Sequence, residues 1–129
     1  MSGLGYSIVD GDGHVQEHDN ELLEHMRDPF PERIRGANFP FFPTLDGYQR
    51  DALRALQDRH PGYVGAKEWL AFLDAHDIES SVLYPTAGLS VGMIQDPDWA
   101  VVLCRAYNDW LSETHMKASE RLIGVALLP

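Results

Sequence analysis

The sequence predicts an α/β fold built on a parallel sheet. Three short apolar runs alternate with segments in which apolar residues recur at helical spacing. The runs do not alternate between apolar and polar residues, which is typical of strands buried on both faces by helices. The 129 residues are enough for one modest domain with its own core.

The first strand is expected at residues 6–9, before a turn at residues 10–13. A stretch rich in Pro, Phe and charged residues follows, and we expect an arm over about residues 19–64. Prolines prevent long regular elements there, although residues 51–59 could form a short helix capped by Asp51. A disordered linker is the alternative, but the many aromatic residues favour a packed segment.

Regular patterns return in the second half of the chain. Helical spacing predicts a helix over about residues 66–77, and a β-branched and aromatic run predicts a strand at residues 80–85. Asp96-Pro97-Asp98 is a strong helix start, and the apolar stripe after it predicts an amphipathic helix that ends near Ser119. A last apolar strand is expected at residues 122–128. A complete protein would rarely stop on such an uncovered strand, so we expect this chain to be part of a longer one.

Charge and cysteine content narrow the possible partners and compartment. Ten basic and 20 acidic residues give a formal net charge of −10, which disfavours nucleic-acid and membrane partners. Cys104 is the only cysteine, so no internal disulfide can form and a cytoplasmic location is expected. Its helical surroundings favour packing over a role as nucleophile. The first residues lack the pattern of a signal peptide.

Residues 10–18 carry the densest group of chemically active side chains. Asp12 and His14 are two residues apart, so in extended backbone both point to the same side. At the carboxyl end of a parallel strand, an oxygen and a nitrogen donor so placed suit Zn²⁺ or a similar divalent ion. A polar turn that binds nothing is the simplest alternative, because Gly-Asp-Gly is common in turns.

A calcium loop is a second alternative. Four acidic or imidazole side chains match loop positions 1, 3, 5 and 12, namely Asp10, Asp12, His14 and Glu21. However, Val15 stands where such a loop requires glycine, and a strand precedes it in place of a helix.

An H-x-x-E-H metalloprotease is a third alternative, since His14-Val15-Gln16-Glu17-His18 matches that motif. The motif requires a helix that places both histidines on one face. Gly11 and Gly13, just upstream, disfavour a helix.

Three segments, in order, resemble the amidohydrolase-related family, which contains aminocarboxymuconate-semialdehyde decarboxylase and related metal-dependent hydrolases. They are Ile8 to Glu17, Tyr107 to Leu111, and Arg121 to Pro129. The resemblance implies that residues 1–129 form a single partial domain. This domain would be the N-terminal part, about three βα units, of a (β/α)8 TIM barrel with a long Pro/Phe-rich arm after strand 1.

The resemblance also implies the site. Asp12 and His14 would be metal ligands for a divalent ion, Zn²⁺ or alternatively Mn²⁺, and Glu17 would lie behind them or line the pocket. His18 stands where relatives often have proline. A further metal-binding histidine and the catalytic aspartate come from later strands in the family, so no catalytic residue is expected in this chain and the chain alone is expected to be inactive. Tyr84 and Thr86 end the second strand and could touch substrate.

Two classes of function follow. The intact enzyme would act on a small carboxylated or cyclic substrate, as a hydrolase through metal-activated water or as a metal-assisted decarboxylase (a carboxy-lyase). The alternative is a non-catalytic α/β fragment that acts only through association. Open strand edges favour a homo-oligomer in either case.

The remaining polar candidates are weaker. A solvated or capping role is expected for three histidines, namely His25, His60 and His76. The charge of His115 would favour the dipole at the end of the long helix. Asn108 and Asp109 are expected to hold a neighbouring loop.

Overall fold

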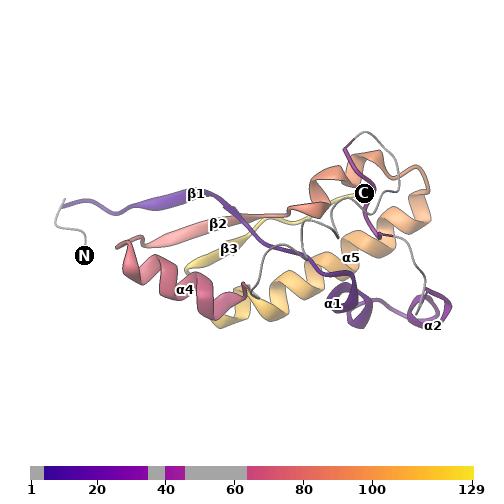
Figure 1. The fold of residues 1–129 in the computed structure, drawn as a ribbon, viewed down its shortest axis with the longest axis horizontal. Helices are drawn as coiled ribbons and strands as arrows, with labels where there is room; N and C mark the ends of the chain where they lie inside the picture. The colour runs from indigo at the N-terminus through magenta and orange to yellow at the C-terminus, as the bar shows by residue number, and fades with distance from the viewer. Residues whose placement is uncertain (1–4, 35–39, 46–63) are drawn as a thin grey trace.

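The computed structural model describes residues 5–34, 40–45 and 64–129 (Figure 1). The helix predicted at residues 51–59 lies outside these residues. In chain order the elements are β1 (Val9–His14), α1 (Asp19–Glu24), α2 (Phe30–Ile34), α4 (Ala66–Ala75), β2 (Ser80–Tyr84), the 3₁₀ helix η1 (Ala87–Met93), α5 (Pro97–Thr114), the 3₁₀ helix η2 (Met116–Ala118) and β3 (Leu122–Gly124).

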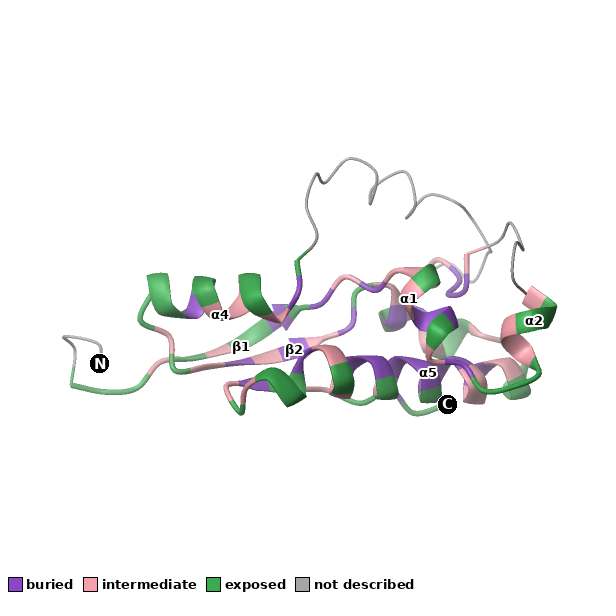
Figure 2. Cartoon of the chain, turned by 90° about the horizontal axis from the view of Figure 1, so that it is seen from below, coloured by how far each residue is buried: buried purple, intermediate pink, exposed green. Residues whose placement is uncertain are grey.

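The three strands form an open parallel sheet in the order β1-β2-β3, which confirms the predicted α/β class. Helices α4 and α5 both lie below the strands in Figure 1, and Figure 2 shows them from that side, with β1 and β2 between them. Side chains of both helices join one buried cluster with Leu83 and Leu122 of the sheet, namely Leu73 of α4 and Leu103 and Leu111 of α5.

The two faces of the sheet differ in burial. Ser81, Leu83 and Leu122 are buried on the face towards α5, where a side chain at Gly124 would collide with Leu111 of that helix. On the opposite face, Val9 is 55% and Ile123 44% exposed. In the described part of the chain this second face is apolar and has no helix over it.

Strand β1 differs from the prediction. The turn expected at residues 10–13 is wrong, because the strand continues to His14. Its pairing with β2 is irregular between Asp10 and Gly13, where β1 has one residue more than its partner. The Asp10 carboxylate accepts hydrogen bonds from the Ser81 hydroxyl (2.8 Å) and the Asp12 amide (3.1 Å). These bonds satisfy groups that the irregular pairing leaves free.

Helix α5 begins as predicted. The Asp96 carboxylate caps it by accepting hydrogen bonds from the amides of Asp98 (3.0 Å) and Trp99 (3.2 Å). The helix ends at Thr114, somewhat before the predicted end, and a short 3₁₀ turn follows. Its apolar stripe is buried, namely Ala100, Leu103, Cys104, Ala106, Tyr107, Trp110 and Leu111. Cys104 thus packs as expected, and burial raises the pKa of its thiol.

Strand β3 is shorter than the predicted run and ends at Gly124. The chain then stays against its neighbours, since the Val125 amide donates to the Leu83 carbonyl (3.0 Å). The Asn108 side chain makes two hydrogen bonds to the backbone of Leu127, of 2.9 and 2.8 Å. Asn108 therefore holds this loop as predicted, whereas Asp109 is exposed.

The described parts of the arm are packed. Helices α1 and α2 are short, as the prolines require, and buried side chains from this region join the core under α5: Leu22, Leu23, Met26, Phe41 and Phe42. The Trp99 indole donates to the Phe41 carbonyl (3.2 Å), and the two rings meet edge to face at 5.6 Å. For these residues the prediction of a packed segment is confirmed. No helix among the residues described is both long enough and apolar enough to cross a bilayer.

Candidate functional site

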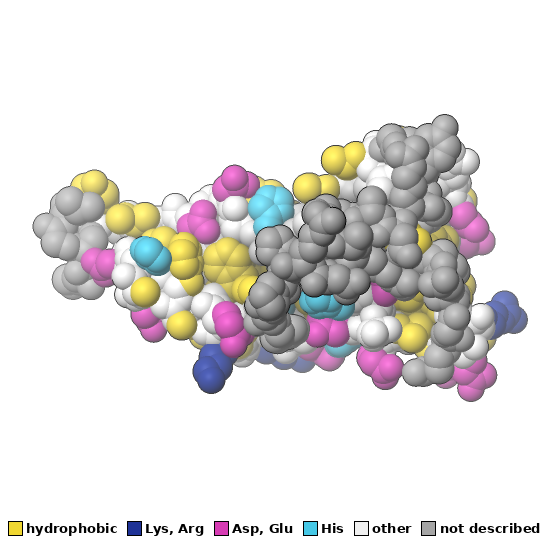
Figure 3. All heavy atoms as spheres, in the orientation of Figure 1, with side chains coloured by type: hydrophobic (Ala, Val, Ile, Leu, Met, Phe, Trp, Pro, Cys, Tyr) yellow, Lys and Arg dark blue, Asp and Glu magenta, His cyan; other side chains and the backbone are white. Residues whose placement is uncertain are grey.

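The candidate site lies at the carboxyl edge of the sheet, where β1 and β2 end. His14 and Tyr84 are paired in register, and their rings lie 6.0 Å apart, tilted by 37°. The surface around the strands carries many acidic and few basic side chains on the face seen in Figure 3, consistent with the net charge of −10. Such a surface favours a cationic ligand.

Asp12 and His14 lie side by side at this edge. The distance from His14 Nε2 to Asp12 Oδ1 is 3.5 Å, and the two side chains are 39% and 92% exposed. Zinc binds nitrogen and carboxylate oxygen at about 2.0–2.2 Å, so two donors at tetrahedral angles stand roughly 3.3–3.5 Å apart. The observed separation fits one divalent ion held between these two atoms.

The other nitrogen of His14 is fixed by the backbone. Nδ1 lies 2.8 Å from the Pro85 carbonyl oxygen. A carbonyl can only accept, so Nδ1 carries a hydrogen and donates it to Pro85. Nε2 is the nitrogen that faces Asp12.

The described residues supply two donors at this place. No group of three or more His, Cys, Asp or Glu side chains in residues 5–34, 40–45 and 64–129 is arranged to hold a metal ion. Among the described residues, Asp12 and His14 therefore have no third side chain of this kind beside them.

Glu17 is almost completely buried, at 2% exposure, behind the end of β2. Its carboxylate accepts hydrogen bonds from the amides of Thr86 (3.0 Å to each oxygen), Ala87 (3.2 Å) and Gly88 (3.0 Å). Burial raises the pKa of the Glu17 carboxyl, and the backbone donors partly offset that rise. Glu17 thus binds the turn after β2.

Tyr84 and Thr86 occupy different positions at this edge. The Tyr84 ring lies 6.0 Å from the His14 ring and is partly exposed. The Thr86 hydroxyl donates to the Val15 carbonyl (2.7 Å) and so joins the loops after β1 and β2.

Three groups of this region have no signal in the sequence as site residues. The Pro85 carbonyl orients His14, and Gly88 leaves room for Glu17, because a β-carbon there would be 3.2 Å from Glu17 Oε1. The Tyr107 hydroxyl is buried with no hydrogen-bond partner among the described residues. Burial and the nearby charge of Glu17 raise its pKa.

The structure contradicts two alternatives for residues 10–21. The metalloprotease motif needs a helix through His14 and His18, but His14 ends a strand and His18 is an extended residue just before α1. The calcium loop needs Glu21 as its last ligand, but Glu21 lies in α1 and accepts a hydrogen bond from the Trp110 indole (2.8 Å).

The remaining histidines have structural roles. His25 and His76 follow the ends of α1 and α4, which confirms the capping expectation for them, whereas His60 lies outside the described residues. His115 ends α5, but the prediction that it is charged is wrong. It is buried, and burial lowers its pKa. The Thr114 hydroxyl donates to the Trp110 carbonyl, so His115 Nδ1 donates to that hydroxyl oxygen and Nε2 is left without a partner in the described structure.

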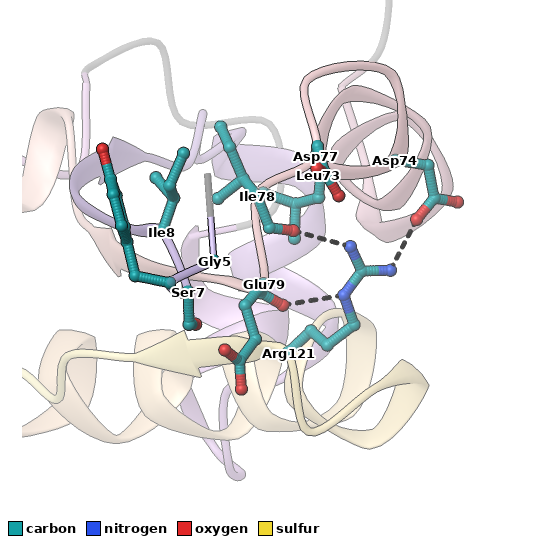
Figure 4. Close-up of a pocket in the computed structure, with 10 residues that line it drawn as sticks. Gly5, Ser7, Ile8, Leu73, Asp74, Asp77, Ile78, Glu79 and Arg121 are labelled. Atoms are coloured by element: carbon teal, nitrogen blue, oxygen red, sulfur yellow. Dashed lines mark hydrogen bonds and ion pairs between the residues drawn. The ribbon is translucent and has the colours of Figure 1, made fainter. Parts of the chain in front are cut away.

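A hollow of about 660 Å³ lies at the opposite, amino edge of the sheet (Figure 4). Its lining includes Tyr6, Ile8, Ile78 and Arg121. The Arg121 guanidinium is fully engaged there, with Asp74 Oδ1 at 2.7 Å and the carbonyls of Ile78 and Glu79 at 2.9 and 2.8 Å. Open parallel sheets bind ligands at their carboxyl edge, so this hollow is not the candidate site.

Comparison with known proteins found no family model that matches the chain and no characterised protein that matches it. The family resemblance therefore depends on the three motifs quoted above, and membership stays a prediction.

Proposed function

We propose that this chain is the N-terminal portion of a metal-dependent enzyme of the amidohydrolase type, with Asp12 and His14 as two ligands of a divalent ion, Zn²⁺ or Mn²⁺. The observation that carries the proposal is the 3.5 Å separation of His14 Nε2 and Asp12 Oδ1 at the carboxyl edge of a parallel sheet. Nδ1 of the same ring is held by a carbonyl, as is usual for metal-binding histidines.

In this proposal each residue of the chain has a defined task. Asp12 and His14 bind the cation, Glu17 and Thr86 hold the two loops together, and Tyr84 lines the approach of a small carboxylated or cyclic substrate. A bound divalent ion supplies Lewis acidity, which serves either hydrolysis by water or decarboxylation. The other ligands and the proton-transferring aspartate would come from later strands of a (β/α)8 barrel.

The sheet supports the barrel part of the proposal. Its uncovered face carries Val9, Val82 and Ile123, and apolar side chains of this kind fill the interior of such barrels. Helices on the other face match the outer ring.

A non-catalytic fragment that acts through association is the second candidate. The same exposed Val9 and Ile123 favour it, because an apolar sheet face with open edges promotes contact between copies. A homo-oligomer is consistent with both candidates, and a cytoplasmic location stays an expectation.

A metal titration of the full chain tests the first proposal. Zn²⁺ and Mn²⁺ affinities are measured by competition with a chromophoric chelator for the wild type, Asp12→Asn and His14→Gln. Loss of either donor should weaken Zn²⁺ binding at least about tenfold, since each supplies one of few ligand bonds. His76→Gln, which changes a histidine at the end of α4, is the matched control and should bind like the wild type. Equal affinity in all four proteins would show that the Asp12 and His14 assignment is wrong.

A further inference from the structure

We propose that Glu17 is a positioning residue that fixes the tautomer of His14 through the turn after β2. The inference deepens the proposed function, since it concerns the histidine assigned there as a metal ligand. It predicts a property of the metal-free protein and can be tested separately.

The first step is the hold of Glu17 on the turn. Its carboxylate accepts from three successive backbone amides, those of Thr86, Ala87 and Gly88. The three donors converge on a side chain that is 2% exposed, so water cannot replace it. The conformation of this turn is therefore set by Glu17.

The second step leads from the turn to the imidazole. Pro85 directly precedes Thr86, and its carbonyl oxygen is 2.8 Å from His14 Nδ1. Two further bonds tie the turn to the β1 loop, from Thr86 Oγ1 to the Val15 carbonyl (2.7 Å) and from the Val15 amide to the Tyr84 carbonyl (2.9 Å). The position of the Pro85 carbonyl thus depends on the turn whose amides donate hydrogen bonds to Glu17.

The third step is chemical. The Pro85 carbonyl accepts from Nδ1 and so favours hydrogen on that nitrogen, which makes Nε2, 3.5 Å from Asp12 Oδ1, the nitrogen that a cation could bind. A free neutral imidazole prefers the opposite tautomer, with hydrogen on Nε2, and that form cannot bind a cation beside Asp12. The backbone contact therefore prepares the ring for a ligand before any ion is present.

A buried carboxylate is costly, and the site keeps one here. Burial raises the pKa of Glu17, so an uncharged residue in this place would avoid the desolvation cost. A glutamine of the same size would aim an NH₂ group at backbone N–H donors, which cannot accept it. Only an acceptor with two oxygens satisfies all three amides.

The experiment compares Glu17→Gln with Glu21→Gln in the full metal-free chain. Glu21 is the matched control, because it also accepts a hydrogen bond from a core group, the Trp110 indole, but makes no hydrogen bond to the turn that contacts His14 in the described structure. The ¹⁵N shifts of the His14 ring are recorded well above pH 6.5, where a free histidine is neutral. Circular dichroism verifies that each variant is folded.

We expect the Nδ1–H form in the wild type and in Glu21→Gln, and a shift towards the Nε2–H form in Glu17→Gln. The Zn²⁺ affinity of Glu17→Gln should fall about 10–100-fold, as for other groups that orient a metal-binding histidine. Glu17→Asp is the second variant if glutamine prevents folding; its carboxylate is one methylene too short, so the same tautomer shift is expected.

An unchanged His14 tautomer in a folded Glu17 variant overturns the inference, and so does an equal shift in Glu21→Gln. A wild type that shows the Nδ1–H form but binds no metal would leave this inference standing and overturn the proposed function.

Discussion

The two edges of the sheet use polar side chains in opposite ways. At the amino edge, the Arg121 guanidinium donates hydrogen bonds to Asp74 and to the carbonyls of Ile78 and Glu79. At the carboxyl edge, Glu17 satisfies the backbone, and the contacts it supports leave one nitrogen of His14 and the Asp12 carboxylate open to solvent. The polar groups of the amino edge bond to one another, whereas those of the carboxyl edge leave two side chains that can still bind a ligand.

The largest loss of stability is expected at the carboxyl edge, from a side chain placed at Gly13. A β-carbon there would collide with Ser81 Oγ and come within 3.0 Å of Leu83 Cδ2, so Gly13→Ala should force β1 away from β2. We expect a loss of about 2–3 kcal/mol in the free energy of unfolding, typical of overpacking. Urea unfolding measures it.

Gly11→Ala is the control for that change. Nothing lies within 4 Å of a β-carbon at Gly11, so this variant should stay close to the wild type. Equal losses of unfolding free energy in Gly13→Ala and Gly11→Ala would mean that the close contacts at Gly13 do not determine the stability of the carboxyl edge.

A smaller loss of stability is expected when the Arg121 contacts at the amino edge are removed. Arg121→Met keeps the length of the side chain but removes its bonds to Asp74 and to two carbonyls. Because the guanidinium is partly solvent-exposed, we expect a loss of only about 1 kcal/mol in unfolding free energy. The His14 ring shifts should not change, since this edge is separate from the site. A changed tautomer would contradict the division between the two edges.

The smallest effect is a change in pH dependence from His115, whose ring packs 5.2 Å from that of Trp110 in α5. Its folded pKa lies below the usual 6.5 because of burial, so the unfolded chain binds the proton more readily. The stability from the buried neutral ring is present above pH 6.5 and is lost as the pH falls through the folded pKa.

His115→Phe should remove that acid-side loss. Chemical unfolding between pH 5 and pH 8 measures the slope, and the variant should lose less stability than the wild type over this range. Parallel curves for the two proteins would show that His115 does not titrate with unfolding.

Part of the fold could be predicted because its signals are local. The cap at Asp96 and the apolar stripe after it depend on neighbouring residues, and both are present as predicted. The first strand was predicted at residues 6–9, but β1 runs from Val9 to His14, and its extent was missed because Asp10 to Gly13 has the composition of a turn. What keeps it extended is Ser81, which lies across the sheet and bonds Asp10.

The candidate site could also be predicted only where its contacts are local in sequence. Asp12 and His14 are two apart in an extended chain, so their proximity could be predicted from strand geometry. The partners of Glu17 are backbone amides about seventy positions later, and backbone groups leave no mark on the sequence. The Pro85 carbonyl was out of reach for the same reason.

The extra residue in β1 has a consequence for the whole edge. In a regular strand Asp10, Asp12 and His14 would all project from one surface. The additional residue in β1 reverses the face from which the following side chains project. Asp10 therefore bonds to Ser81 on one face of the sheet, whereas His14, after the irregularity, lies beside Tyr84 on the other face. Because of this one additional residue, the first half of β1 bonds to the neighbouring strand through Asp10, and the second half places His14 at the candidate site.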